Sequence, residues 1–127
     1  MLRTIYRLSN NISNYPSRRF FSKKYTATHE WLLQENDYVK IGLSQKAVDE
    51  LGELVYLDFN VEENEKIQWN DELLEIESIK AVAVVNAPFD CIIKDINYNL
   101  ADIENLEKLS KNPECENNSW LLKLIKQ

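Results

Sequence analysis

From Tyr25 onward, the sequence consists of short runs of β-branched, aromatic and aliphatic residues separated by polar turns. Such runs suit the pleated surface of a sheet better than the surface of a helix. They predict strands at residues 37–41, 54–59 and 120–125. A chain of this kind is restricted to a mainly β fold.

Two segments show helical periodicity instead. In residues 44–52, Ser44 is a suitable N-cap and Gly52 a suitable C-terminal stop for a helix. In residues 100–109, leucine and isoleucine recur every three residues. We therefore predict two helices among the strands.

The segment from residue 72 to residue 88 predicts a β-hairpin. Leu74 and Ile76 alternate with glutamates, as in a half-buried strand, and a second β-prone run follows at residues 82–85. The intervening residues 78–81 lack the usual Asn-Gly turn signal. Lys80 lies close to the predicted tip. Taken alone, a lysine beside a turn is more often solvated surface than a modified residue.

Charge is distributed unevenly along the chain. The first 24 residues contain six basic and no acidic residues, whereas the remainder contains nine basic and all 21 acidic residues, a net charge of −12. Apolar residues of the leader recur at three- and four-residue steps, at Leu2, Ile5, Leu8, Ile12 and Tyr15. An acid-free, arginine-bearing, amphipathic leader is typical of a mitochondrial transit peptide, and Arg19-Phe20-Phe21-Ser22 resembles a processing site. We predict a transit peptide at residues 1–21, a functional domain at residues 22–127 and a location in the mitochondrial matrix.

The alternative for the leader is a basic tail that binds nucleic acid or a membrane surface. A tail of that kind usually lacks a helical apolar stripe. The acidic body would repel phosphate, which argues against nucleic acid. No apolar stretch approaches the roughly 18 residues that a membrane span needs. The sequence therefore predicts neither a nucleic-acid nor a membrane partner.

Cysteine and histidine are scarce. Cys91 and Cys115 are the only cysteines, and His29 is the only histidine. These are too few for a disulfide scaffold or for a histidine-based metal site. A small cysteine hydrolase that uses Cys91 and His29 is the enzyme alternative, although no motif supports it. We interpret His29 as a structural residue, packed or hydrogen-bonded beside Trp31.

Several ordered motifs resemble those of one protein family. Glu77-Ser78-Ile79-Lys80-Ala81 is similar to the lipoylation motif Glu-Ser-Val-Lys-Ala of glycine cleavage H proteins, and Lys24 to Trp31 resembles that family's Tyr-Thr-x-x-His-Glu-Trp signature. The stretch from Ile41 to Val55 resembles its Gly-Ile-Thr and Leu-Gly-Asp segment. Downstream, Ala87-Pro88-Phe89, Ile96-Asn97 and Trp120 follow in the expected order. The resemblance covers nearly all of the chain after the leader.

This resemblance implies a lipoyl-carrier domain with a barrel-sandwich hybrid fold and peripheral helices. It implies lipoate covalently attached to Lys80, with Glu77 and Ala81 read by the lipoate-attaching enzymes. It also places Glu30 and Thr28 near a cleft that shelters the arm, where a carboxylate would stabilise a protonated amine. Such a protein catalyses no reaction by itself.

The resemblance also implies the partners. The pyridoxal-phosphate P protein, a glycine dehydrogenase, would load an aminomethyl group onto the lipoyl arm during glycine decarboxylation. The arm would deliver that group to the T protein, an aminomethyltransferase, and the L protein, a dihydrolipoamide dehydrogenase, would reoxidise the arm. Tethering turns successive encounters into local ones at high effective concentration.

Some positions depart from the family pattern. Val84 replaces a carboxylate commonly found four residues after the lysine, and family glycines are replaced at Asn70, Leu74 and Ser119. Asparagine tolerates the left-handed backbone that glycine adopts, but leucine does not. These changes leave lipoylation expected but weaken the case for glycine decarboxylation, which opens an alternative, a relay that supplies lipoyl groups to 2-oxoacid dehydrogenase complexes. An acyltransferase lipoyl domain and a biotin carrier are disfavoured, because the chain has the His-Glu-Trp opening and no methionine beside Lys80.

Overall fold

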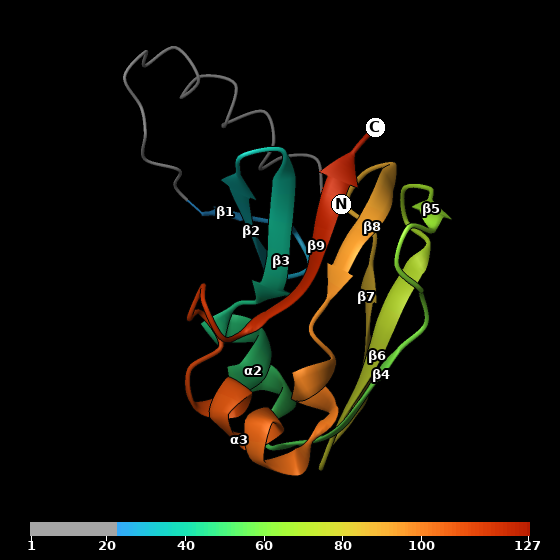
Figure 1. The fold of residues 1–127 in the computed structure, drawn as a ribbon. Coiled ribbons are helices and arrows are strands. Elements are labelled where there is room, and N and C mark those ends of the chain that lie inside the picture. Colours follow the sequence, from blue (N-terminus) through green and yellow to red (C-terminus); the bar gives the residue numbers. More distant parts are fainter. Residues whose placement is uncertain (1–22) are drawn as a thin grey trace.

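The computed structural model describes residues 23–127, which fold into a sandwich of two antiparallel sheets (Figure 1). The larger sheet has the strand order β1-β2-β3-β9-β8-β5, and the smaller has the order β4-β6-β7. The strands of the larger sheet are β1 Lys24–Tyr25, β2 Glu30–Glu35, β3 Tyr38–Leu43, β9 Trp120–Lys126, β8 Cys91–Ile96 and β5 Lys66–Ile67. Those of the smaller sheet are β4 Leu54–Phe59, β6 Glu72–Ser78 and β7 Val82–Asn86. The predicted mainly β sandwich is thus confirmed.

The core lies between the two sheets. Ile41, Leu122 and Leu124 of the larger sheet and Ile76 of the smaller one have no solvent exposure. Glutamates alternate with the apolar Leu74 and Ile76 along β6, which gives the smaller sheet one buried and one outer face. The alternation predicted for β6 is confirmed.

A close contact between β2 and β3 fixes the position of the largest core side chain. Trp31 lies directly opposite Gly42, and a Cβ at Gly42 would come within 2.4 Å of the indole ring. The indole Nε1 donates a hydrogen bond to the Pro113 carbonyl oxygen at 2.9 Å, so this buried donor is satisfied. Only glycine leaves room for the ring at this position.

The first predicted helix is confirmed as α2, Gln45–Leu51. The Ser44 hydroxyl accepts a hydrogen bond from the Ala47 N–H at 3.1 Å, which is the usual N-cap contact. Gly52 ends the helix with a φ of 81° and a ψ of −154°, a conformation that is essentially restricted to glycine. Val48 anchors the helix to the core.

The second predicted helix is divided into a 3-10 turn, η1 Tyr98–Ala101, and the α-helix α3, Ile103–Lys111. Asp102 separates them with an extended ψ of 141°. Nine steps of about 100° would place Leu100 and Leu109 on opposite sides of one continuous helix. The break allows both leucines to be buried, while Ile103 stays exposed.

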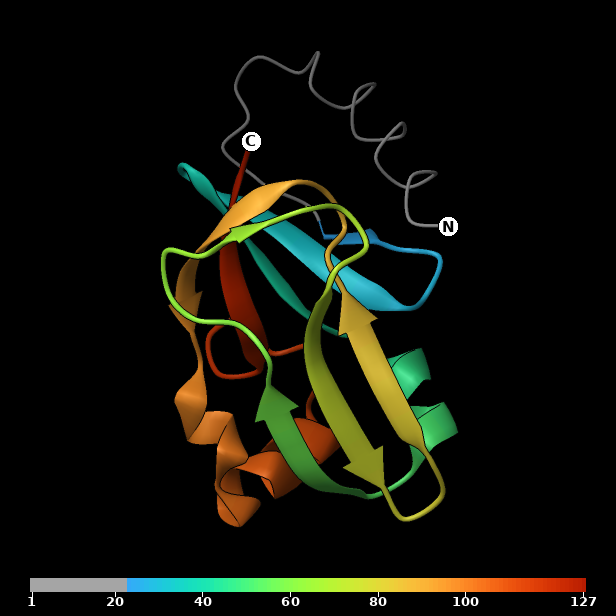
Figure 2. The same ribbon diagram turned by 90° about the vertical axis from the view of Figure 1, so that its right-hand side faces the viewer.

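Both helices lie at one end of the sandwich, the end at which the β6–β7 hairpin also turns (Figures 1 and 2). The predicted leader, residues 1–21, lies outside the described residues. None of the helices in the described part of the chain is long and apolar enough to cross a membrane.

Candidate functional site

Lys80 lies at the tip of the hairpin that joins β6 to β7, visible at the lower right of Figure 2. Its side chain is exposed, and no residue of the described chain forms an ion pair with its amine. The predicted hairpin is confirmed, with Glu77 opposite Val82 as the last cross-strand pair before the turn.

Ser78 closes the turn, which lacks the usual Asn-Gly pair. Its hydroxyl oxygen accepts hydrogen bonds from the backbone N–H groups of Lys80 at 3.1 Å and Ala81 at 3.0 Å. The Ser78 N–H donates to the Ala81 carbonyl oxygen at 2.8 Å. A serine hydroxyl that bonds nearby backbone groups can close a turn in this way. The serine of the motif therefore fixes the backbone around the lysine.

The hairpin tip rests on the connection between α2 and β4. The Ile79 N–H donates to the Glu53 carbonyl oxygen at 3.0 Å. A Cβ at Gly52 would lie 3.3 Å from the Cε of Lys80, tighter than an ordinary contact. Gly52 thus ends the helix and also leaves space for the lysine stem. The sequence predicted only the first of these roles.

The outer face of the smaller sheet combines acidic and apolar side chains beside Lys80. Residues directly opposite one another share a face, and two such rows point outward: Tyr56–Glu77–Val82 and Asp58–Glu75–Val84. Glu77 is half-buried, and Ala81 is exposed in the turn. The departure at Val84 therefore exposes an apolar side chain next to a carboxylate.

The other departures from glycine have separate structural reasons. Asn70 adopts a φ of 74°, which confirms that asparagine substitutes for glycine in a left-handed turn. Leu74 has no solvent exposure and lies opposite Phe59 and Val85. Its side chain fills the core, so no glycine-like backbone is required there. The Ser119 hydroxyl donates to the Asn112 carbonyl oxygen at 2.7 Å.

Glu30 is a buried carboxylate at the start of β2. The hydroxyls of Thr26 and Thr28 donate to its Oε1 at 2.6 and 2.7 Å. Burial raises the pKa of Glu30, although the two hydroxyl hydrogen bonds and the nearby His29 act in the opposite direction. Thr26 is buried as fully as Glu30, and no motif in the sequence identified it as a partner of this carboxylate.

Helix α2 connects this carboxylate to the hairpin. The Ser44 N–H at its first end donates to the His29 carbonyl oxygen at 2.9 Å, next to Glu30. Gly52, at its last end, lies beside the Lys80 side chain, because a Cβ there would come within 3.3 Å of the lysine Cε. The seven residues of α2 rise about 10 Å. The lysine and the buried carboxylate are therefore located at opposite ends of one short helix.

His29 contributes to the fold through its backbone. It adopts a φ of 72°, and its N–H donates to the Thr26 carbonyl oxygen at 3.1 Å, which closes the turn before β2. Its carbonyl oxygen receives the bond from Ser44.

Cys91 has the properties of a core residue. It has no solvent exposure, and burial raises the pKa of its thiol to about 11, helped by the negative charges of Asp90 and Asp71. A nucleophilic cysteine requires the thiolate, which is scarce at neutral pH under these conditions. Among the described residues, no group of three histidine, cysteine or acidic side chains is arranged to hold a metal ion.

Two antiparallel sheets enclose one core, and an exposed lysine lies at the tip of a tight hairpin, which is the arrangement expected of a small carrier domain. The comparisons with known proteins agree with that class. The family model of the glycine cleavage H-protein matches residues 23–127. The chain therefore belongs to the glycine cleavage H-protein family.

Individual relatives support the same assignment. The glycine cleavage system H protein of Thermotoga maritima is 38% identical over 102 residues, which cover 80% of this chain and 78% of that protein. That of Prochlorococcus marinus strain MIT 9515 is 38% identical over 99 residues, which cover 78% and 73%. The crystal structure of a glycine cleavage system H protein from Mycobacterium marinum superposes with a TM-score of 0.72 at 27% identity, covering 83% of this chain and 84% of that one.

Proposed function

We propose that this protein is the lipoyl carrier of the glycine cleavage system, with lipoate in amide linkage to the Nζ of Lys80. The observation that carries the proposal is the position of Lys80, exposed at the tip of a braced hairpin in a chain of the H-protein family. The protein acts as a substrate and carrier for its partners and catalyses no step by itself.

The residues around Lys80 fit a covalently attached arm. Attachment requires an exposed amine, and the Lys80 side chain is exposed at the end of the smaller sheet. Ser78 holds the turn backbone, and Gly52 leaves space beside the lysine Cε. When bound, the lipoyl group supplies a redox-active disulfide that can accept an aminomethyl group.

Glu77 and Ala81 flank the lysine and form the part of the motif that lipoate-attaching enzymes would read. Glu30 and Thr28 would receive the far end of the arm. A protonated amine placed beside the buried Glu30 carboxylate would gain a charge-assisted hydrogen bond. The distance along α2, about 10 Å, suits an arm that starts at Lys80 and lies along the helix.

The partners would be the P, T and L proteins and the lipoate-attaching enzymes. A body with a net charge of −12 over residues 25–127 would be attracted to partners with basic surfaces. One tether would serve all three reactions, because it raises the local concentration of the arm at each partner.

We also propose that residues 1–21 direct the protein to the mitochondrial matrix and are removed there. The support is the acid-free basic leader and the family model, whose match begins at residue 23. N-terminal sequencing of protein recovered from mitochondria would give a start near Ser22. An intact Met1 in that sample would refute the transit peptide.

Reconstitution tests the carrier function. Lipoylated protein mixed with purified P protein should support glycine–bicarbonate exchange, and Lys80→Arg should abolish both lipoylation and exchange. Lys46→Arg is the matched control, because Lys46 is also an exposed lysine and lies on α2. A fully lipoylated sample that gives no exchange would rule out the role in glycine decarboxylation.

A further inference from the structure

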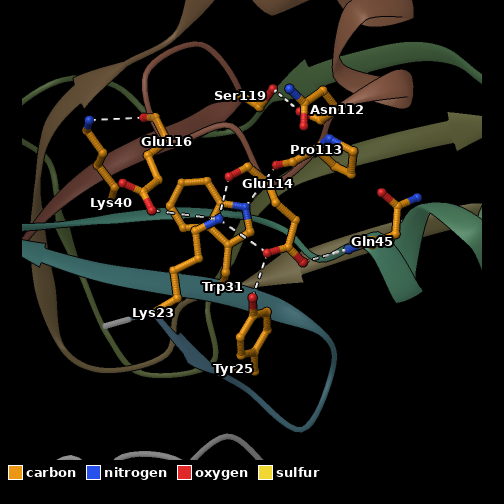
Figure 3. A network of polar contacts seen from close by, with 10 residues as sticks. All are labelled: Lys23, Tyr25, Trp31, Lys40, Gln45, Asn112, Pro113, Glu114, Glu116 and Ser119. Carbon is orange, nitrogen blue, oxygen red and sulfur yellow. Dashed lines mark hydrogen bonds and ion pairs between the residues drawn. The ribbon is translucent and has the colours of Figure 1, made fainter. Parts of the chain in front are cut away.

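One carboxylate joins three segments that are far apart in the sequence (Figure 3). Oε1 of Glu114 accepts the Tyr25 hydroxyl at 2.6 Å and pairs with the Lys23 Nζ at 3.2 Å. Oε2 accepts the backbone N–H of Gln45 at 2.9 Å. Both oxygens are therefore occupied, each by a different segment.

The first of these segments is the beginning of the described chain. The Lys23 Nζ lies 4.7 Å from the centre of the Trp31 ring and also donates to the backbone oxygen of Glu114. Tyr25 pairs with Trp31 in the register of β1 with β2. The residues that directly follow the expected leader are thus held by the loop between α3 and β9.

The second segment is the first turn of α2. Gln45 is the first residue of the helix, and α2 has no acidic residue in its own first turn. Glu114 supplies a negative charge and an acceptor to that end from a distant part of the chain, which is a favourable arrangement at a helix N-terminus. Partial burial opposes ionisation of Glu114, but the hydrogen bonds from Tyr25, Gln45 and Lys23 outweigh it and lower the pKa.

The other end of α2 supports the hairpin tip. A Cβ at Gly52 would lie 3.3 Å from the Lys80 Cε, and the carbonyl oxygen of the next residue, Glu53, accepts the Ile79 N–H. Helix α2 is only seven residues long, so its two ends lie about 10 Å apart. The contacts of Glu114 are at its first end, and the support of the hairpin tip is at its last end.

We propose that Glu114 is a positioning residue for Lys80. It ties Lys23 and Tyr25 to the first turn of α2, and α2 holds the hairpin tip in the orientation that presents the lysine amine for modification. The proposal rests on the proposed function, because it concerns attachment of lipoate to Lys80. It also requires that processing of the leader leaves Lys23 in the mature protein.

Glu114→Gln tests the proposal with little change in size. An amide replaces one of the two carboxylate oxygens with an NH2 donor, so it cannot accept both at the Oε1 position, where Tyr25 donates, and at the Oε2 position, where the Gln45 N–H donates. Glu116→Gln is the matched control. Glu116 lies in the same loop and pairs with Lys23 at 3.9 Å, but within residues 23–127 its carboxylate forms no hydrogen bond or ion pair with α2.

Two readouts on the full-length protein separate positioning from general stability. Hydrogen exchange at the Ile79 amide reports the bond to Glu53, with the Ile41 amide in the central β3 as the internal reference. Kinetics with a lipoate-attaching enzyme report presentation of the lysine. For Glu114→Gln we expect exchange to accelerate, relative to the wild type, more at Ile79 than at Ile41. We also expect a kcat of lipoylation about fivefold lower with little change in KM. Glu116→Gln should match the wild type in both.

Equal acceleration of exchange at Ile79 and Ile41, or unchanged lipoylation kinetics in Glu114→Gln, would overturn the positioning role. If the wild-type protein is not lipoylated at all, the proposed function fails. The exchange measurement would then still decide whether Glu114 controls the hairpin tip.

Discussion

Ser78→Ala should loosen the turn that presents Lys80 without disturbing the core. The substitution removes a hydroxyl that accepts from the N–H groups of Lys80 and Ala81 at 3.1 and 3.0 Å. It leaves the backbone bond from the Ser78 N–H to the Ala81 carbonyl oxygen at 2.8 Å. The strands should therefore stay paired, while the two N–H groups in the turn lose their acceptor.

The size of the effect follows from the exposure of the turn. A neutral hydrogen bond contributes about 1 kcal/mol net, and three are lost, since the Ser78 hydroxyl also donates to the Ala81 carbonyl oxygen at 3.2 Å. Because water can reach both N–H groups, we expect a total loss of only about 1 kcal/mol in the free energy of unfolding. In a domain of this size that corresponds to a fall in Tm of roughly 4–8 °C.

Urea denaturation measures the free energy of unfolding, and hydrogen exchange of the Lys80 and Ala81 amides measures the turn directly. Ser110→Ala is the control, since the Ser110 hydroxyl is buried without a hydrogen-bond partner in the described chain. Its removal should be neutral or stabilising, because alanine also favours helix. If Ser78→Ala retained wild-type stability and wild-type exchange at both amides, the closure of the turn by Ser78 would be refuted.

Three further predictions concern glycine and cysteine positions. Gly42→Ala places a Cβ within 2.4 Å of the Trp31 ring and should destabilise the protein by about 3 kcal/mol in urea denaturation. Gly52→Ala, at a φ of 81° and beside the Lys80 Cε, should cost about 2 kcal/mol and slow lipoylation. Stability should fall by about 2–3 kcal/mol as pH rises from 9 to 11, because the buried Cys91 thiol keeps its proton to about pH 11 while the unfolded chain releases it near 9.0.

Each of these outcomes has a clear contradiction. Gly42→Ala with wild-type stability would mean that Trp31 does not pack on that strand as described. Gly52→Ala that is destabilised but lipoylated at the wild-type rate would show that the contact with Lys80 is irrelevant to modification. In Cys91→Ala the loss of stability between pH 9 and 11 should be smaller. An unchanged pH profile would show that other titrating groups cause that loss.

Sequence patterns predicted several of the strands, but they did not predict strands that are buried on both faces. The alternation in β6 predicted the hairpin correctly. In β2, by contrast, Glu30, Trp31, Leu32 and Leu33 are all buried, so no alternation marks the strand. The Pro113 carbonyl oxygen accepts the indole N–H of Trp31, so the loop that contains Pro113 covers part of this strand. The pattern of residues within one strand cannot predict burial of that strand by a segment distant in the sequence.

The candidate site, too, could be predicted from the sequence only in part. Lys80 and its turn were predictable because the motif is contiguous. The proximity of Gly52 to the Lys80 side chain and the bond from Ile79 to Glu53 were not, because they join residues separated by more than two dozen positions. Both depend on how α2 packs against the smaller sheet. Sequence reasoning therefore located the exposed lysine at the hairpin tip but not the residues that hold that tip in place.

The most direct test of the central claim is the intact mass of the mature protein from its own cells, with peptide mapping across residues 73–88. The account predicts a mass increment that matches one lipoyl amide, located on Lys80. An unmodified Lys80, in cells that lipoylate their other substrates, would contradict it.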